Sequence, residues 1–536
     1  MAGNMFGDLG VGVAARLERA GRAMWDEAPA GDRPGRTMGG SEFSDWLPWR
    51  HYDPEHGIYI QSRRDPGKPD SDKKTGIGFV LEVVPLVGGS DQIQRILTEM
   101  FNEGLPEHAK CQVIQWASPK IGPILDNWAM ERARRGGVYA ELAKHRRELF
   151  RRGAWTSMSA KSDFLARDFR VFLSVEVNGA SDEAAFRKLA TVRERFISSF
   201  ATIGTQAFDM PPEHLIAAMQ DLLNPSTSIV ESPPSYDPEV EINKQCVRWD
   251  TRINVYPDHL EFRTHAPADG FADTDWKRDL NGKTEAFEVR ALACRQFPDN
   301  CHQGHMTNAI GSLFNEQLRL PGPTVASFVF SLLSTEATRS QTEFKRARTQ
   351  QTIDRGAARL FPGMQKSAED WAAVANDVSQ GARLAHVGFF VLAMAKAGDG
   401  ERVESAVRAV YRSAQFSLER HDLKHQPTLM ACLPLGMGGG MDEDLKGMGR
   451  LRRMPTTVAP KLAPFQGEYS SRRLPHMLLT GRRGQMLYWS PFENEGDGNH
   501  NVCVVGSSGS GKSVGMQEMS TSLSGAGADV IVIDNG

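Results

Sequence analysis

The stretch "NVCVVGSSGSGKSVGMQEM" (Asn501–Met519) decides the fold predicted for the C-terminal part of this chain. It contains the pattern GxxxxGKS from Gly506 to Ser513, which is typical of a phosphate-binding loop. The apolar run Val502–Val505 before the loop predicts a buried strand, and the residues after the loop predict a helix that ends at glycines. Because the pattern requires this strand–loop–helix context, the sequence predicts the start of a P-loop nucleotide-binding domain.

Each residue type in the loop has a chemical role. Glycines allow successive backbone amides to point inward around phosphate oxygens, and the start of the following helix adds its positive end. The Lys512 ammonium supplies charge at the β- and γ-phosphates, and the Ser513 hydroxyl is a hard oxygen ligand for Mg²⁺. We therefore expect ATP and Mg²⁺ as cofactors, with Lys512 as the catalytic residue and Ser513 as the metal ligand. The residues expected to bind the nucleotide are Gly506, Ser507, Ser508, Gly509, Ser510, Gly511, Lys512 and Ser513.

The last eight residues, "DVIVIDNG" (Asp529–Gly536), allow two interpretations. They resemble a Walker B strand, whose Asp534 would help to hold Mg²⁺. However, Asp534 lies 534 − 512 = 22 residues after Lys512, and this gap fits one crossover helix and the next strand. Since Asn535 follows in place of a second acid, we favour the second strand of the nucleotide domain. We then expect the Walker B acids, the catalytic acid and the arginine finger in a longer parent protein. In this chain we expect the strands from Asn501 onward to be poorly stabilised, because a parallel sheet needs covered faces and flanking strands.

Composition limits the class of protein. The chain has 536 residues, of which 40% are apolar and 24% are charged, so we expect a globular protein of two to four domains. A net charge of −3 argues against coating nucleic acid by bulk charge, although a local basic groove stays possible. Six scattered cysteines fit a reducing compartment, and no apolar run has the length of a membrane-spanning helix. The expected location is the cytoplasm, with any membrane attachment made through a partner.

Strand-like and helix-like segments alternate through most of the chain. Alternating apolar residues predict a strand at Phe169–Val177, and a serine cap with an apolar face predicts a helix at Ser90–Gly104. Further expected elements are strands at Gly76–Gly88, Cys111–Ser118, Thr324–Ser334 and Ala382–Ala395, a helix at Ser181–Phe200, and a long polar helix that ends near Asn376. The predicted fold class is α/β, with a large N-terminal α+β domain built from two related βαβ-type modules side by side, followed by the beginning of a RecA-like P-loop domain.

This pattern gives four segments. Residues 1–40 have the composition of a flexible tail, and residues 41–435 form the α+β domain. The glycine-rich segment 436–450 is expected to be a flexible linker, and residues 451–536 are the start of the nucleotide domain, with a hairpin turning at Gly481–Gly484. Near the start of the α+β domain, the tryptophans of "WLPWR" (Trp46–Arg50) fit either a partner anchor or a cap on the core.

Four segments together resemble the TraC-type ATPases of F-like conjugative type IV secretion systems, which are related to the VirB-class secretion ATPases and the HerA/FtsK motors. These segments are "FSDWLPWRHYDPEHGIYI", "GFVLEVVPL", "PTLMACLPLG" and "NVCVVGSSGSGKS…DVIVIDNG", and their order is more specific than the phosphate-binding loop alone. The resemblance implies an N-terminal domain for docking and oligomer contacts, followed by a RecA-like motor. It also implies a hexamer at the cytoplasmic face of the inner membrane, which uses ATP and contacts inner-membrane subunits of the secretion system.

Two other functions remain open from the sequence. The chain could be a soluble P-loop kinase or NTPase whose N-terminal region binds the substrate, or a scaffold whose nucleotide site is vestigial. A nucleic-acid partner is possible but not indicated, because the basic residues of the long polar helix also fit a solvated surface.

Overall fold

The computed structural model describes residues 42–65, 68–179, 183–265, 284–354, 363–471, 473–493 and 499–533. The predicted tail at 1–40 and the candidate Walker B residue Asp534 lie outside these ranges. The described strands form a large 13-stranded sheet and a separate two-stranded hairpin. The path through the large sheet is β1-β2-β3-β5-β4-β10-β11-β9-β8-β7, with β6, β12 and β13 added beside it.

The strands of the large sheet come from most of the chain. Its first half contains β1 (Trp49–Asp53), β2 (Ile58–Asp65), β3 (Lys68–Val83), β4 (Lys110–Ser118), β5 (Asp168–Asn178) and β6 (Ala207–Asp209). Its second half contains β7 (Arg252–Val255), β8 (Leu260–His265), β9 (Thr284–Gln296), β10 (Thr324–Leu332), β11 (Leu384–Lys396), β12 (Ser417–Arg420) and β13 (Arg452–Pro455). Each described pair of neighbouring strands in this sheet is antiparallel.

The two halves of the sheet have the same topology. In the first half the spatial order is β6-β3-β5-β4, and in the second it is β12-β9-β11-β10. Since β3 and β4 are both antiparallel to β5, they run in the same direction with β5 between them. This is a split βαβ arrangement, with an α-helix in the crossover of the first half and the 3₁₀ helix η2 (Gln303–Ile310) in that of the second, and the halves are joined where β4 pairs with β10. The structure thus contains two related modules side by side, as predicted, but one antiparallel strand lies between the two parallel strands of each crossover.

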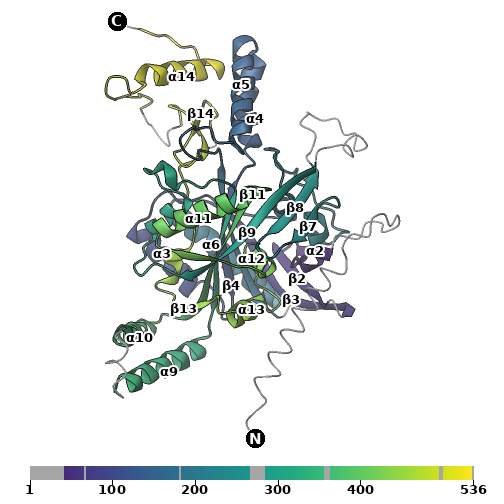
Figure 1. The fold of residues 1–536 in the computed structure, drawn as a ribbon, viewed down its shortest axis with the longest axis vertical. Coiled ribbons are helices and arrows are strands. Elements are labelled where there is room, and N and C mark those ends of the chain that lie inside the picture. The colour runs from purple at the N-terminus through teal and green to yellow at the C-terminus, as the bar shows by residue number, and fades with distance from the viewer. Residues whose placement is uncertain are drawn as a thin grey trace.

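Helices cover both faces of this sheet (Figure 1). One face packs against α3 (Asp91–Asn102), α6 (Glu183–Thr202), α11 (Gly400–Ser413) and the short helices η2 (Gln303–Ile310) and η5 (Ala459–Leu462). The other face packs against α2 (Glu42–Trp46), α7 (Pro212–Leu223), α8 (Ile242–Cys246), α12 (His425–Ala431) and α13 (Met441–Gly447). A further short helix, η3 (Glu316–Leu318), precedes β10.

Burial on both faces explains the composition of the central strands. All nine residues of β4 are buried, and the seven residues between Lys110 and Ser118 are all apolar or amide-bearing and do not alternate with charges. In β5, Val171 and Leu173 join the core on one face and Phe172 joins the core on the other. The predicted helix after β3 is also confirmed, because the Ser90 side chain accepts a 3.2 Å hydrogen bond from the amide of Ile93 at the start of α3.

Each module carries a helical hairpin at the same topological position. The pair α4 (Gly122–Arg135) and α5 (Gly137–Gly153) lies between β4 and β5, and the pair α9 (Thr335–Asp354) and α10 (Gly363–Ser379) lies between β10 and β11. The two hairpins project from opposite ends of the molecule (Figure 1). The prediction of one long polar helix ending near Asn376 was wrong, because the helix ends at Asp354 and a second helix packs against it.

The glycine-rich segment 436–450 is packed against the sheet. Met437, Met441 and Leu445 are buried in one of the two main cores, and residues 441–447 form α13. The expectation of a flexible linker there was wrong, because these apolar side chains hold the segment in place. Packing also continues beyond residue 450, where β13 pairs with β11 and Phe465 is fully buried.

Trp49 and Arg50 belong to the interior. Trp49 is fully buried and its indole nitrogen donates a 2.9 Å hydrogen bond to the carbonyl of Pro434. Arg50 is 1% exposed and donates to the backbone carbonyls of Leu47 and Asp45 at 2.6 and 2.9 Å. Of the two interpretations of Trp46–Arg50, the structure supports a cap on the core for these two residues.

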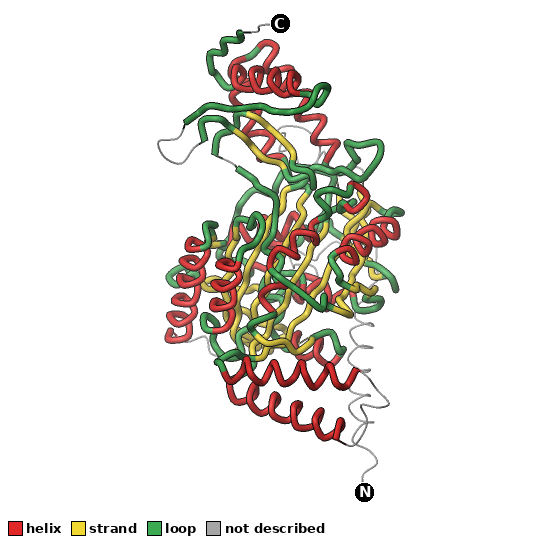
Figure 2. The backbone as a smooth tube through the Cα atoms, turned by 90° about the vertical axis from the view of Figure 1, so that its left-hand side faces the viewer, coloured by secondary structure: helices red, strands yellow, loops and turns green. Residues whose placement is uncertain are grey.

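Beyond the large sheet, β14 (Met477–Thr480) and β15 (Met486–Trp489) form the hairpin predicted around Gly481–Gly484. The last described helix, α14 (Lys512–Gly525), lies at the same end of the molecule as α4 and α5. Figure 2 shows the hairpin between this helix and the main body. The phosphate-binding loop is therefore at one end of the molecule.

Candidate nucleotide-binding site

The eight predicted site residues form one exposed turn and the start of α14. Within the turn, the amide of Ser510 donates a 3.2 Å hydrogen bond to the carbonyl of Ser507. Gly509 and Gly511 have φ angles of +75° and +90°, which residues with a Cβ atom rarely adopt. Gly511 is the residue that precedes the first turn of α14, so its conformation sets the direction in which the helix begins.

Gly506 packs closely against the Ser510 side chain within the loop. A Cβ atom there would lie 2.5 Å from the hydroxyl oxygen of Ser510. Three glycines are thus explained by the loop itself, one by a close approach and two by their backbone conformation. These features fit the backbone cradle that a nucleotide phosphate needs.

The Lys512 side chain turns back onto the loop. Its ammonium donates hydrogen bonds of 2.8 and 2.9 Å to the carbonyls of Gly506 and Ser507. Ser513 is exposed in the first turn of α14, where the unpaired amides and the helix dipole favour an anion. The residues present therefore fit a phosphate group with a metal ion beside it.

The strands predicted on either side of the loop and helix are not formed. Residues 502–505 and 529–533 have no strand structure, and Val505 and Ile531 are 87% and 88% exposed. The buried strand predicted from the composition of Val502–Val505 is thus absent, which agrees with the expectation that the strands from Asn501 onward are poorly stabilised in this chain. A parallel strand is stable only when neighbouring strands and covering helices surround it, and no described segment pairs with these residues. Within residues 499–533, the structure thus presents the loop and its helix without the strands of a RecA-like domain.

The opposite end of α14 is held by the α4–α5 hairpin. Arg132 and Arg135 of α4 donate to the carbonyls of Ser522 and Ser524, the first at 2.8 Å. In α5, the hydroxyl of Tyr139 lies 2.8 Å from that of Ser524. Sequence reasoning did not identify this contact. The only local signal is the pair Gly136–Gly137, which separates two helical stretches rich in arginine.

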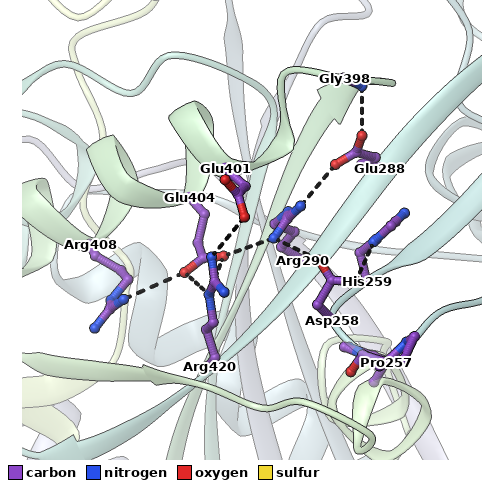
Figure 3. A network of polar contacts seen from close by, with 11 residues as sticks. Pro257, Asp258, His259, Glu288, Arg290, Gly398, Glu401, Glu404, Arg408 and Arg420 are labelled. Carbon is purple, nitrogen blue, oxygen red and sulfur yellow. Dashed lines mark hydrogen bonds and ion pairs between the residues drawn. The ribbon is translucent and has the colours of Figure 1, made fainter.

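A second polar cluster lies in the second module (Figure 3). Glu404 of α11 is 2% exposed and accepts two hydrogen bonds, of 2.7 and 2.9 Å, from Arg420. Arg290 of β9 lies 3.4 Å from Glu404 and 3.2 Å from both Asp258 and Glu288. Because each carboxylate faces an arginine, we interpret this cluster as the contact that fixes α11 on the sheet.

Comparison with known proteins identifies the family. The family described as "TraC protein" matches residues 43–437, which is most of the chain. The chain belongs to the TraC family. The matched segment contains strands β1 to β12 of the large sheet and most of its covering helices, while α13, β13 and η5 lie beyond it.

One curated relative of this TraC-family chain is Protein TraC of Escherichia coli (strain K12). The two are 22% identical over an alignment of 531 positions, which covers 95% of this chain and 56% of the relative. The chain therefore spans little more than half the length of that relative. Among the described residues of this TraC-family chain, every helix is too short or too polar to span a bilayer.

Proposed function

We propose that this chain is the docking domain and phosphate-binding segment of an ATPase that serves a conjugative type IV secretion system. Membership of the TraC family supports a role in conjugative transfer or pilus assembly. The loop from Gly506 to Ser513 carries the proposed chemistry, because its glycines have the close approach and the positive φ angles that a phosphate cradle uses.

In this proposal, the chain's own residues bind and orient the triphosphate. The amides of the loop and of the first turn of α14 donate to phosphate oxygens, and the Lys512 ammonium exchanges its two carbonyl partners for β- and γ-phosphate oxygens. Ser513 would hold Mg²⁺, which would neutralise charge developing on the phosphates. Hydrolysis also needs an acid to orient water, and we place that group in the longer protein.

The assembly proposed from the family is a homo-oligomer, with a hexamer as the expected ring, at the cytoplasmic face of the inner membrane. Residues 41–435 would dock it onto inner-membrane subunits of the secretion system. The continuous two-module sheet supports this role, since a rigid body buried on both faces offers a stable surface for such contacts.

Complementation tests this function. A full-length protein with Lys512→Ala should be produced at the normal level, hydrolyse no ATP, and fail to support pilus assembly or transfer in cells that lack the native protein. Full activity of that variant would indicate a scaffold with a vestigial site. Transfer of the γ-phosphate to a protein or small molecule would instead identify a kinase.

A further inference from the structure

The C-terminal end of α14 contacts the α4–α5 hairpin through a buried arginine. Arg132 is 3% exposed, although it lies on α4 among exposed residues. Its guanidinium lies 4.1 Å from the centre of the Trp128 ring and donates to the carbonyls of Trp128 and Pro475 at 2.7 and 3.1 Å. Burial, and then the neighbouring Arg146, lower the pKa of Arg132 to about 10, so the side chain remains charged at neutral pH.

This arginine joins three segments that are far apart in sequence. Besides α4 itself, it binds the loop before β14 at Pro475 and His476, and it binds α14 at the carbonyl of Ser522. That carbonyl lies in the last turn of α14, where it also accepts from the amide of Ala526 and where the negative end of the helix dipole favours a cation. The contact therefore stabilises α14 in one position against the hairpin.

A second contact fixes the rotation of α14. Arg146 of α5 forms an ion pair with Glu518, which also accepts a 2.9 Å hydrogen bond from Ser522. Both charged side chains are about one-third exposed, at 29% and 30%. Gly525 allows α14 to pack closely against the hairpin, since a Cβ atom there would lie 3.2 Å from atoms of both Arg132 and Tyr139.

Helix α14 links these contacts to the phosphate-binding loop. It has 14 residues, a length of about 21 Å, with Lys512 and Ser513 at one end and Ser522 and Gly525 at the other. A helix this short behaves as a rigid rod, so any shift of its C-terminal end also moves the phosphate-binding loop at its N-terminal end.

We propose that the α4–α5 hairpin positions the phosphate-binding loop through α14, with Arg132 and Arg146 as positioning residues. This inference rests on the proposed function, because it assumes that the loop binds the phosphates of MgATP. The hairpin connects β4 to β5, and Tyr488 of β15 donates to the carbonyl of Ile124 at the start of α4. Nucleotide binding at the loop is therefore linked to the central strands of the docking domain.

Two measurements on the 536-residue chain test the proposal. The first is the affinity for MgATP, which we expect to fall about tenfold in Arg132→Gln and about fivefold in Arg146→Gln. The charge-reversed pair Arg146→Glu with Glu518→Arg should recover most of the affinity, which a general loss of folding would not allow. The second is hydrogen exchange, in which MgATP should slow the amides of Gly137–Gly153 in the wild type, because coupling between two sites is reciprocal.

The matched control is Arg134→Gln. Arg134 lies between the two interface arginines of α4, is 66% exposed, and pairs only within its own helix with Glu131 at 3.0 Å. This variant should bind MgATP as the wild type does. If Arg132→Gln and Arg146→Gln both bind MgATP with the affinity of the wild type, the positioning role is overturned and the proposed function stands. If the wild type itself binds no MgATP, the proposed function fails and this inference fails with it.

Discussion

The guanidinium of Arg132 donates a 2.8 Å hydrogen bond to the carbonyl of Ser522, across 390 residues of sequence. This bond joins an insertion in the first sheet module to the helix that begins at the phosphate-binding loop. The second module has a matching insertion, α9–α10, at the opposite end of the molecule. The duplicated architecture thus uses one of its two equivalent hairpins to contact the candidate nucleotide site.

Removing the charge of Glu404 should destabilise the second module. Glu404→Gln leaves the buried Arg290 without one of its carboxylates, and breaking such a pair costs about 3 kcal/mol. Chemical denaturation would measure the loss. The control is Glu401→Gln, since Glu401 is 76% exposed and lies 3.7 Å from Arg420 (Figure 3). An equal effect of the two variants would contradict a structural role that depends on burial.

The buried carboxyl of Glu176 should make stability depend on pH. Burial raises its pKa to about 8, and this effect outweighs the opposing effects of Lys110 and of the hydrogen bond from Gln61. A folded-state pKa above the unfolded value means that the folded protein binds more protons, so this contribution is complete below about pH 4.5 and is lost as the pH rises through 8.

Thermal unfolding of Glu176→Gln over this pH range measures the effect. The variant should lose the decline in stability between about pH 5 and 8 that the wild type shows. Glu55→Gln, on an exposed turn, is the control and should keep the wild-type profile. Identical profiles for the wild type and Glu176→Gln would show that the carboxyl titrates normally in the folded protein.

The two tryptophans near the start of the first module should differ in their effect on folding. Trp49→Ala removes a fully buried ring and its hydrogen bond to Pro434, so we expect a loss of about 3–5 kcal/mol in the free energy of unfolding. Trp46 is only partly buried, so Trp46→Ala should cost less. If Trp49→Ala has the wild-type free energy of unfolding but does not assemble with partners, the partner-anchor interpretation is correct.

Alanine substitutions at Gly511 and Gly515 distinguish the effect of the loop conformation on MgATP binding from the effect of helix stability. A Cβ atom at either Gly511 or Gly515 would meet open space, but only Gly511 has a positive φ angle. Gly511→Ala should strain the loop by about 1–2 kcal/mol and weaken MgATP binding about tenfold. Gly515→Ala lies within α14 and should stabilise the helix by up to about 1 kcal/mol. Calorimetric titration with MgATP distinguishes them, and equal affinities would contradict the importance of the loop conformation.

Local sequence signals predicted the central strands β3, β4, β5, β10 and β11 of the sheet, whereas several of its outer strands were not predicted. Alternation predicted β5, and the Ser90 cap predicted the start of α3. The duplication was also predicted, although the inserted strand in each module was not, since strand order depends on contacts between distant residues.

The errors arose where tertiary contacts override local composition. Consecutive glycines at 438–440 indicate flexibility, yet neighbouring methionines and leucines anchor that segment in the core. Val502–Val505 has the composition of a buried strand, but a strand of a parallel sheet cannot form without neighbours. The assignment of Gly506–Ser513 as a nucleotide site stays a prediction, and its signal is local: the pattern GxxxxGKS lies within eight residues, and Gly509 and Gly511 have the positive φ angles that such a loop uses.

The central claim is that Gly506–Ser513 binds the phosphates of MgATP. Equilibrium titration of the 536-residue chain with MgATP tests this most directly, with Lys512→Ala as the test variant and Lys461→Ala, on a short helix of the main body, as the control. We predict saturable binding by the wild type and by Lys461→Ala, and none by Lys512→Ala. Equal binding by Lys512→Ala, or no binding by the wild type, would contradict the account.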